Sequence, residues 1–210
     1  MKKLFLLLAV ISTILFCTSC ESVVTFKEPQ PIRTDALSKF PKRIQGNYLS
    51  KENTSTLTIS DNMILETVDY YQKTKLDSNY KVVADTIVNI ARNERHQGKL
   101  EGDSILEHIH FIDTLFLISA KQILKKFKGY YFLNSQYENE TWYVKKLSLS
   151  KGRLAISDID SEESINLLRE VTETTADTTS YNFNPTRKQF KKFVRQEGFN
   201  NNESYIRIRD

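Results

Sequence analysis

The chain has 210 residues, of which 40% are hydrophobic, and 30 lysines and arginines stand against 26 aspartates and glutamates. This length allows one domain with a substantial core, or two small ones. A formal net charge of +4 is too small to favour nucleic-acid binding. Both cysteines lie within the first twenty residues, so the rest of the chain can form neither a disulfide framework nor a cysteine metal site.

The first twenty residues have the three-part layout of an export signal: two lysines, an apolar run over 4–16, and small residues before Cys20. The apolar run is too short to be a spanning helix. Its ending, Cys17-Thr18-Ser19-Cys20, resembles the lipobox of bacterial lipoproteins, with Cys17 at a position that is usually aliphatic. The resemblance implies cleavage before Cys20 and acylation of Cys20 with palmitate-type chains. An ordinary cleaved signal and an uncleaved anchor are the alternatives.

We therefore expect residues 1–19 to be a signal peptide and the mature chain to keep 191 residues with a net charge of +2. The lipid predicts a location in the bacterial cell envelope, in the outer membrane where two membranes are present. The membrane is then a partner through the N-terminal lipid. No later segment approaches the 18 or more apolar residues of a spanning helix.

Residues 20–39 contain Pro29 and Pro31 and are predicted to form an extended tether. Residues 40–210 are predicted to form a single, mainly β domain with a helical C-terminal part, because short runs of β-branched and aromatic residues alternate with turn residues. The expected strands are 46–49, 56–60, 63–71, 80–88, 98–100, 105–111, 115–119, 129–133, 141–149 and 153–159. The predicted fold class is α+β, with an antiparallel β-meander sheet or small barrel followed by two helices.

The first helix is expected after Asp160 or Ser161, either of which can cap it. The second is expected to begin near Pro185, where Thr186 and Gln189 have capping-box spacing, and to stop at Gly198. A final strand is possible over 204–209. Parts of this pattern resemble lipocalin-type lipoproteins, with Gly46 near the first strand and a meander after it, although the arginine and tryptophan placement of that family is missing.

All three histidines, His96, His108 and His110, lie within fifteen residues. On a strand, His108 and His110 point to the same side, and a hairpin would bring His96 near them. A polar stripe on a solvent-facing sheet is the ordinary interpretation of these residues. Because some zinc sites use the same spacing, the three histidines are metal-ligand candidates as the alternative.

Two charged segments coincide with the expected helices. The acidic run 158–163 is interpreted as helix capping, with a calcium site as the alternative. The second helix carries five cations on one arc, interpreted as a face that is solvated or paired with the acidic stretch 155–180, with an anionic partner as the alternative. These are Arg187, Lys188, Lys191, Lys192 and Arg195.

Aromatic residues are numerous, and Tyr131 and Trp142 are the candidates for lining a ligand cavity if the sheet closes into a barrel. Core packing is the ordinary role for such residues. No catalytic motif and no cofactor-binding motif are found in the sequence.

The sequence therefore favours a non-enzymatic, membrane-anchored lipoprotein of the cell envelope that acts as a binding or accessory protein with an envelope protein partner. A lipocalin-like carrier of a small apolar ligand is the first alternative. A metal-dependent hydrolase using His96, His108 and His110 is the second.

Overall fold

The computed structural model describes residues 24–52, 54–137, 140–173 and 181–208. It is mostly antiparallel β-sheet with two C-terminal helices, which confirms the predicted α+β class. The strands are β1 (Thr25–Phe26), β2 (Ala36–Leu37), β3 (Gly46–Ser50), β4 (Ser55–Ile59), β5 (Met63–Lys75), β6 (Tyr80–Val83), β7 (Thr86–Asn89), β8 (Glu94–Glu101), β9 (Ser104–Leu117), β10 (Gln122–Phe127), β11 (Tyr130–Gln136), β12 (Trp142–Ser150), β13 (Arg153–Asp158), β14 (Asn182–Phe183) and β15 (Asn201–Arg207). The helices are a 3-10 turn at Lys42–Ile44, α2 (Glu162–Thr172) and α3 (Arg187–Arg195).

The strands join in one sheet of order β2-β10-β11-β12-β13-β15-β3-β4-β5-β9-β8-β7-β6. Two antiparallel segments, called the first and second meander below, are β3 to β9 and β10 to β13; in the first, β5 pairs with β9 and not with β6. The C-terminal strand β15 connects them, because it pairs with β13 on one side and β3 on the other. A bridge between Ser119 and Gln122 closes the turn from β9 to β10. Strands from both meanders therefore face one interior, and Phe116, Leu133 and Tyr205 share a single buried cluster.

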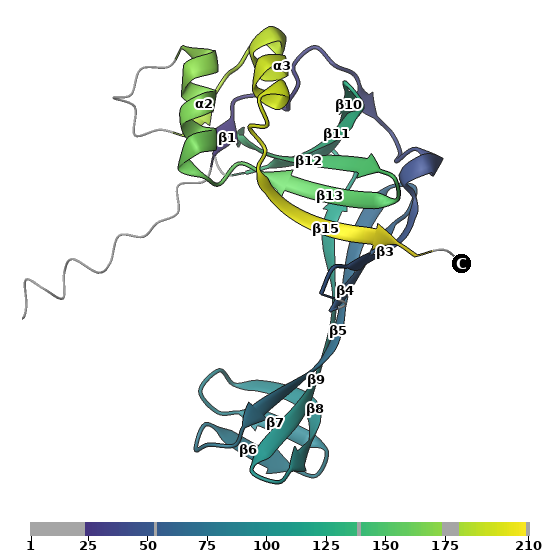
Figure 1. The fold of residues 1–210 in the computed structure, drawn as a ribbon, viewed down its shortest axis with the longest axis vertical. Coiled ribbons are helices and arrows are strands. Elements are labelled where there is room, and N and C mark those ends of the chain that lie inside the picture. The colour runs from purple at the N-terminus through teal and green to yellow at the C-terminus, as the bar shows by residue number, and fades with distance from the viewer. Residues whose placement is uncertain (1–23, 53, 138–139, 174–180, 209–210) are drawn as a thin grey trace, which may run out of the picture.

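The opposite face of the second meander is covered by α2 and α3 (Figure 1). Phe132 and Val144 from the sheet meet Phe190 and Phe193 from α3 in a second buried cluster. Both helices begin as predicted: the Ser161 hydroxyl accepts from the Ser164 N–H, and Thr186 and Gln189 form a capping box. Within the described residues, no helix has the length and hydropathy needed to span a membrane.

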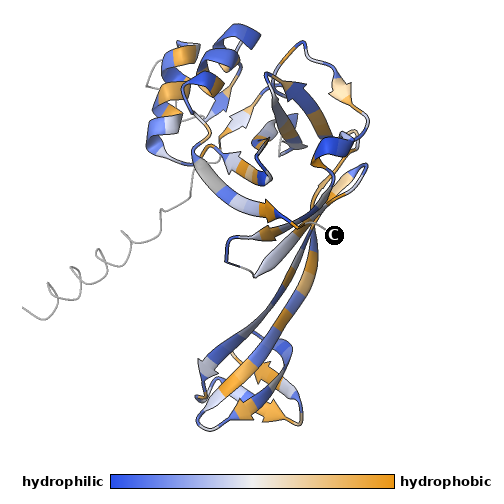
Figure 2. Ribbon diagram, turned by 45° about the vertical axis from the view of Figure 1, so that its right-hand side comes forward, coloured by the Kyte–Doolittle hydropathy of each residue, from blue (hydrophilic) through white to orange (hydrophobic). Residues whose placement is uncertain are grey.

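A narrow arm, defined here as residues 69–110, extends from this body (Figures 1 and 2). Its stem is the pair β5 and β9, and its end is a small sheet that adds β8, β7 and β6 to β9. Ile87 and Ile105 are fully buried in the end sheet. The predicted strand 80–88 is two strands with a turn at Ala84, and the predicted strands 105–111 and 115–119 are one continuous β9.

The expected tether differs from the structure, because residues 24–37 are packed against the body. Phe26 is fully buried and pairs with Trp142, and β2 pairs with β10. Lys125 donates hydrogen bonds to the carbonyls of Pro29 (2.7 Å) and Pro31 (3.0 Å). The two prolines keep the segment out of regular ladders, as expected, but buried side chains and a buried lysine hold it in place. Residues 20–23 lie outside the described residues.

Candidate functional site

The sheet register separates the three histidines that were considered as one metal site. Gln97 is the cross-strand partner of His108, so these two side chains share a face. His96 precedes Gln97 and therefore points to the other face, where it lies 3.7 Å from Glu94. The three-histidine site is corrected on this ground: His108 and His110 come together, and His96 does not join them.

Asp69, which the sequence did not single out, takes the place expected for His96. His108 Nε2 lies 2.8 Å from Asp69 Oδ1, and His110 Nδ1 lies 3.2 Å from Asp69 Oδ2. These hydrogen bonds to histidine hold the pKa of the Asp69 carboxyl below its usual value. The pairing of β5 with β9 was not predicted from the sequence, because 38 residues separate Asp69 from His108 and local patterns do not report such long-range contacts.

The two aromatic candidates for a ligand cavity are packing residues. Tyr131 is fully buried within the cluster enclosed by the two meanders. Trp142 is half-buried against the helix-covered core and is paired with Phe26 of β1. Neither side chain lines the groove described next.

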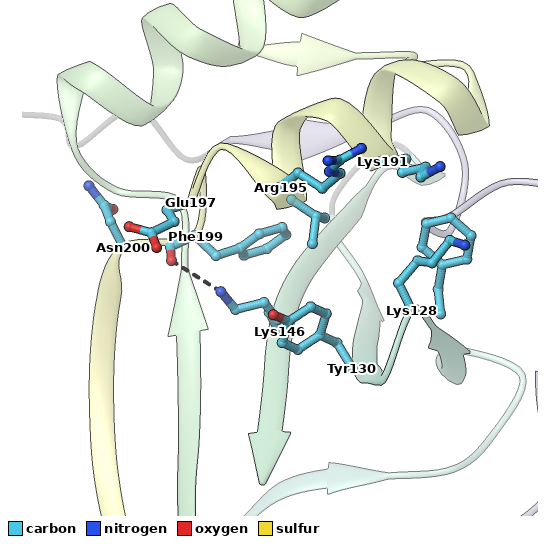
Figure 3. A pocket seen from close by; sticks show the side chains of 10 residues that line it. Lys128, Tyr130, Lys146, Lys191, Arg195, Glu197, Phe199 and Asn200 are labelled. Carbon is cyan, nitrogen blue, oxygen red and sulfur yellow. Dashed lines mark hydrogen bonds between the residues drawn. The ribbon is translucent and has the colours of Figure 1, made fainter. Parts of the chain in front are cut away.

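The main candidate site is a groove of about 870 Å³ between α3, the turn from β10 to β11, the middle of β12 and the segment that follows α3 (Figure 3). Four cationic side chains and one carboxylate line it, together with aromatic and aliphatic groups. The lining residues are Phe127, Lys128, Tyr130, Lys146, Lys191, Val194, Arg195, Glu197, Phe199 and Asn200. We refer to it below as the basic groove.

Lys146 is the most constrained cation of the basic groove. Its Nζ donates to the carbonyl of Phe199 at 3.3 Å and lies 5.5 Å from the ring centroids of both Tyr130 and Phe199. Partial burial lowers the pKa of its ammonium group, while the Glu197 carboxylate acts in the opposite direction. The ammonium is thus held between two aromatic faces at the edge of the core.

Local sequence explains how the groove is built. The β10–β11 hairpin turns at Lys128 and Gly129, which both have positive φ angles (52° and 90°), and this places Lys128 at the rim. After α3, Gly198 lies so close to the Phe193 ring that an added Cβ would come within 2.1 Å of it. This close approach carries the chain back across the sheet and brings Phe199 into the groove.

The cations of the predicted basic arc of α3 make different contacts. Lys191 and Arg195 line the basic groove, whereas Lys192 forms a salt bridge with Glu170 of α2 (3.3 Å). The Arg187 guanidinium lies 5.0 Å from the centroid of the Phe127 ring. A face that looks uniform in the sequence is therefore partly paired within the domain.

Sequence reasoning missed Lys128, Lys146 and the aromatic lining, although one signal was present. Trp142, Val144 and Lys146 alternate along β12 and so share the face covered by the helices. A lysine in such a row indicates a cation at the margin of a core.

The acidic run at 158–163 has a structural role. Ser161 caps α2, and Glu162 and Glu163 lie in its first turn, where carboxylates stabilise the helix dipole. Asp158 accepts a hydrogen bond from the Tyr143 hydroxyl (3.1 Å) and lies 3.7 Å from Lys145.

Comparison with known proteins gives no match: no family model, no curated protein sequence and no solved structure is significantly similar to this chain.

Proposed function

We propose that this is a lipid-anchored protein of the bacterial cell envelope that binds an anionic ligand bearing an apolar group, and that the basic groove is its binding site. The observation that carries the proposal is the gathering of Lys128, Lys146, Lys191 and Arg195 around one hollow that contains a single carboxylate, Glu197. Among the described residues, the salt bridges of the domain involve none of these four cations.

The physical basis is electrostatic attraction at a partly desolvated surface. Like charges held close together in a hollow repel one another, and an anion that enters the hollow removes that repulsion. Lys146 is already partly desolvated, so a hydrogen bond from its ammonium to a phosphate or carboxylate is stronger than the same contact in open solvent. The Tyr130 and Phe199 rings beside it provide an apolar surface for the rest of the ligand.

Anchoring through Cys20 would fix how the protein faces the membrane. Val24 is buried in the body four residues after Cys20, and four residues span at most about 14 Å. A lipid on Cys20 would thus hold the β1 end of the body next to the bilayer, with α2 and α3 at the same end (Figure 1). The arm would extend away from the bilayer, where an envelope protein partner can meet it.

The binding proposal is tested by titration calorimetry of the detergent-solubilised protein with phenyl phosphate, and with benzyl alcohol as the uncharged counterpart. We expect Lys146→Met to weaken phenyl phosphate binding by about tenfold or more, because a hydrogen bond to a charged group contributes about 1.5–3 kcal/mol. Glu197→Gln should strengthen binding, since it removes the one carboxylate of the groove.

Lys188→Gln is the matched control, because Lys188 is an exposed cation on the same helix that does not line the basic groove. It should leave phenyl phosphate binding within about twofold of the wild type, since an exposed charge that does not contact the ligand contributes little. Equal binding of benzyl alcohol and phenyl phosphate, or equal binding by wild type and Lys146→Met, would refute the proposal.

A further inference from the structure

The stem of the arm carries a cluster that is independent of the basic groove, and we propose that it binds a transition-metal ion. In this proposal Asp69 of β5 and His108 and His110 of β9 are the ligands of one divalent cation of the Zn²⁺ type. One carboxylate oxygen and one ring nitrogen from each histidine all lie within 4.8 Å of one another.

The register of the sheet brings the three ligands together. Asp69 is the cross-strand partner of His110, and His108 lies two residues away on the same face of β9. Tyr71, the partner of His108, stacks on its imidazole with ring centroids 4.7 Å apart and an interplanar angle of 15°. The Asp69 N–H also donates to the Thr54 carbonyl (3.0 Å), which fixes the backbone at this ligand.

The donor set selects the class of metal. Two imidazoles and one carboxylate are a common ligand set for Zn²⁺, with one position left for water or a further ligand. Mg²⁺ and Ca²⁺ prefer oxygen ligands throughout, so two ring nitrogens disfavour them. The side chains are 27% (His108), 49% (His110) and 55% (Asp69) exposed, so an ion reaches them from solvent.

A metal bound at this cluster would stiffen the narrowest part of the stem. Going from the body toward the end of the arm, the pairing of β4 with β5 ends at Val68, and the pairing of β8 with β9 begins at His108. Between these points the stem is only two strands wide, and Asp69 and His110 lie in that stretch. Two-stranded ribbons are marginally stable alone, so an ion bound to both strands would stiffen the connection between the body and the arm.

The test is titration of the detergent-solubilised, chelator-treated protein with ZnCl₂, followed by calorimetry. We expect one equivalent to bind with a dissociation constant in the micromolar range or below. Because loss of an outer-sphere partner of a metal ligand already costs roughly 10–100-fold in affinity, His110→Ala and Asp69→Asn should each cost at least about 100-fold. Zn²⁺ should also slow amide hydrogen exchange at 68–70 and 109–111.

His96→Ala is the matched control, because His96 lies on the neighbouring strand β8 and also faces a carboxylate, but on the opposite face of the sheet from His108. It should bind Zn²⁺ as the wild type does. Amide exchange in β11 to β13 reports whether each variant keeps its body folded. The proposal is overturned if the wild type shows no saturation at millimolar Zn²⁺, if the folded His110→Ala variant binds normally, or if His96→Ala loses as much affinity as His110→Ala.

Discussion

At the scale of single residues, close packing at a few positions decides the shape of the basic groove. Gly198 makes room for the Phe193 ring and ends the turn after α3 with a hydrogen bond from its N–H to the Phe193 carbonyl (3.1 Å). The glycine was predicted as a helix stop, and it does follow α3. Its second role, as the space into which an aromatic ring fits, depends on a contact that no sequence pattern encodes.

Gly198→Ala is expected to lower the free energy of unfolding by about 1–3 kcal/mol, because the added methyl overlaps the Phe193 ring and forces it to move. Urea denaturation measures the loss. Phe193→Leu, made in the Gly198→Ala background, should cost less than Phe193→Leu alone, since the smaller side chain relieves the overlap. Additive costs in this double-mutant cycle would contradict the account.

At the scale of elements, the arm depends on very little buried surface. Its end sheet buries Ile87 and Ile105 completely, while Val83, Ile90 and Leu100 are exposed. Gly98 allows β8 to lie close to β9, since an added Cβ would stand 2.4 Å from the Leu106 carbonyl oxygen and 2.7 Å from Cγ1 of Ile87. The end sheet is therefore expected to be the part of the chain that opens first.

Gly98→Ala should disrupt the end sheet and leave the body folded. Amide hydrogen exchange is expected to accelerate in β6, β7 and β8 by about tenfold or more, because an overlap with backbone costs at least about 1.4 kcal/mol. Exchange in β11 to β13 should not change. Gly102→Ala is the control: its φ of 64° strains an alanine, but no atom lies within 4 Å of the added Cβ, so exchange should rise less than in Gly98→Ala.

At the scale of the whole molecule, the C-terminal strand β15 joins the two meanders and thereby sets the direction of the arm relative to the helices (Figure 1). β5 alone has 13 residues and spans about 40 Å. The segment after Val24 is fixed to the body by Phe26 and Lys125. A domain anchored by a lipid on Cys20 would therefore have little freedom to rotate relative to the membrane.

This arrangement predicts opposite results for labels at the two ends of the molecule. If Cys20 is acylated as proposed, a fluorophore on Lys27→Cys should be quenched by a lipid-borne quencher in liposomes that contain the protein, because position 27 lies seven residues from Cys20. A fluorophore on Ser78→Cys, in the turn at the far end of the arm, should stay bright. Cys20→Ser should release both proteins from the liposomes. Equal quenching at the two positions would show that the arm lies along the bilayer.

The sequence alone was enough for the features that depend on neighbouring residues. Strand alternation predicted most strands of the sheet, and capping residues located both helices, because these signals act over two to four residues. The basic helix and its attraction to the acidic stretch 155–180 were also visible, although the particular pair Lys192–Glu170 was not. The signal and lipidation at Cys20 stay predictions from the sequence.

The tertiary structure decided everything that depends on residues far apart in the chain. It placed β15 between two meanders, packed the predicted tether onto β10 and β12, and moved His96 to the opposite face from His108. It also brought Asp69 to His108 and His110, and Lys146 to Phe199. A change of one residue in strand register reverses the face of a side chain, and register is set by the packing of the whole sheet. For that reason the complete set of residues at each candidate site is seen only in the folded chain.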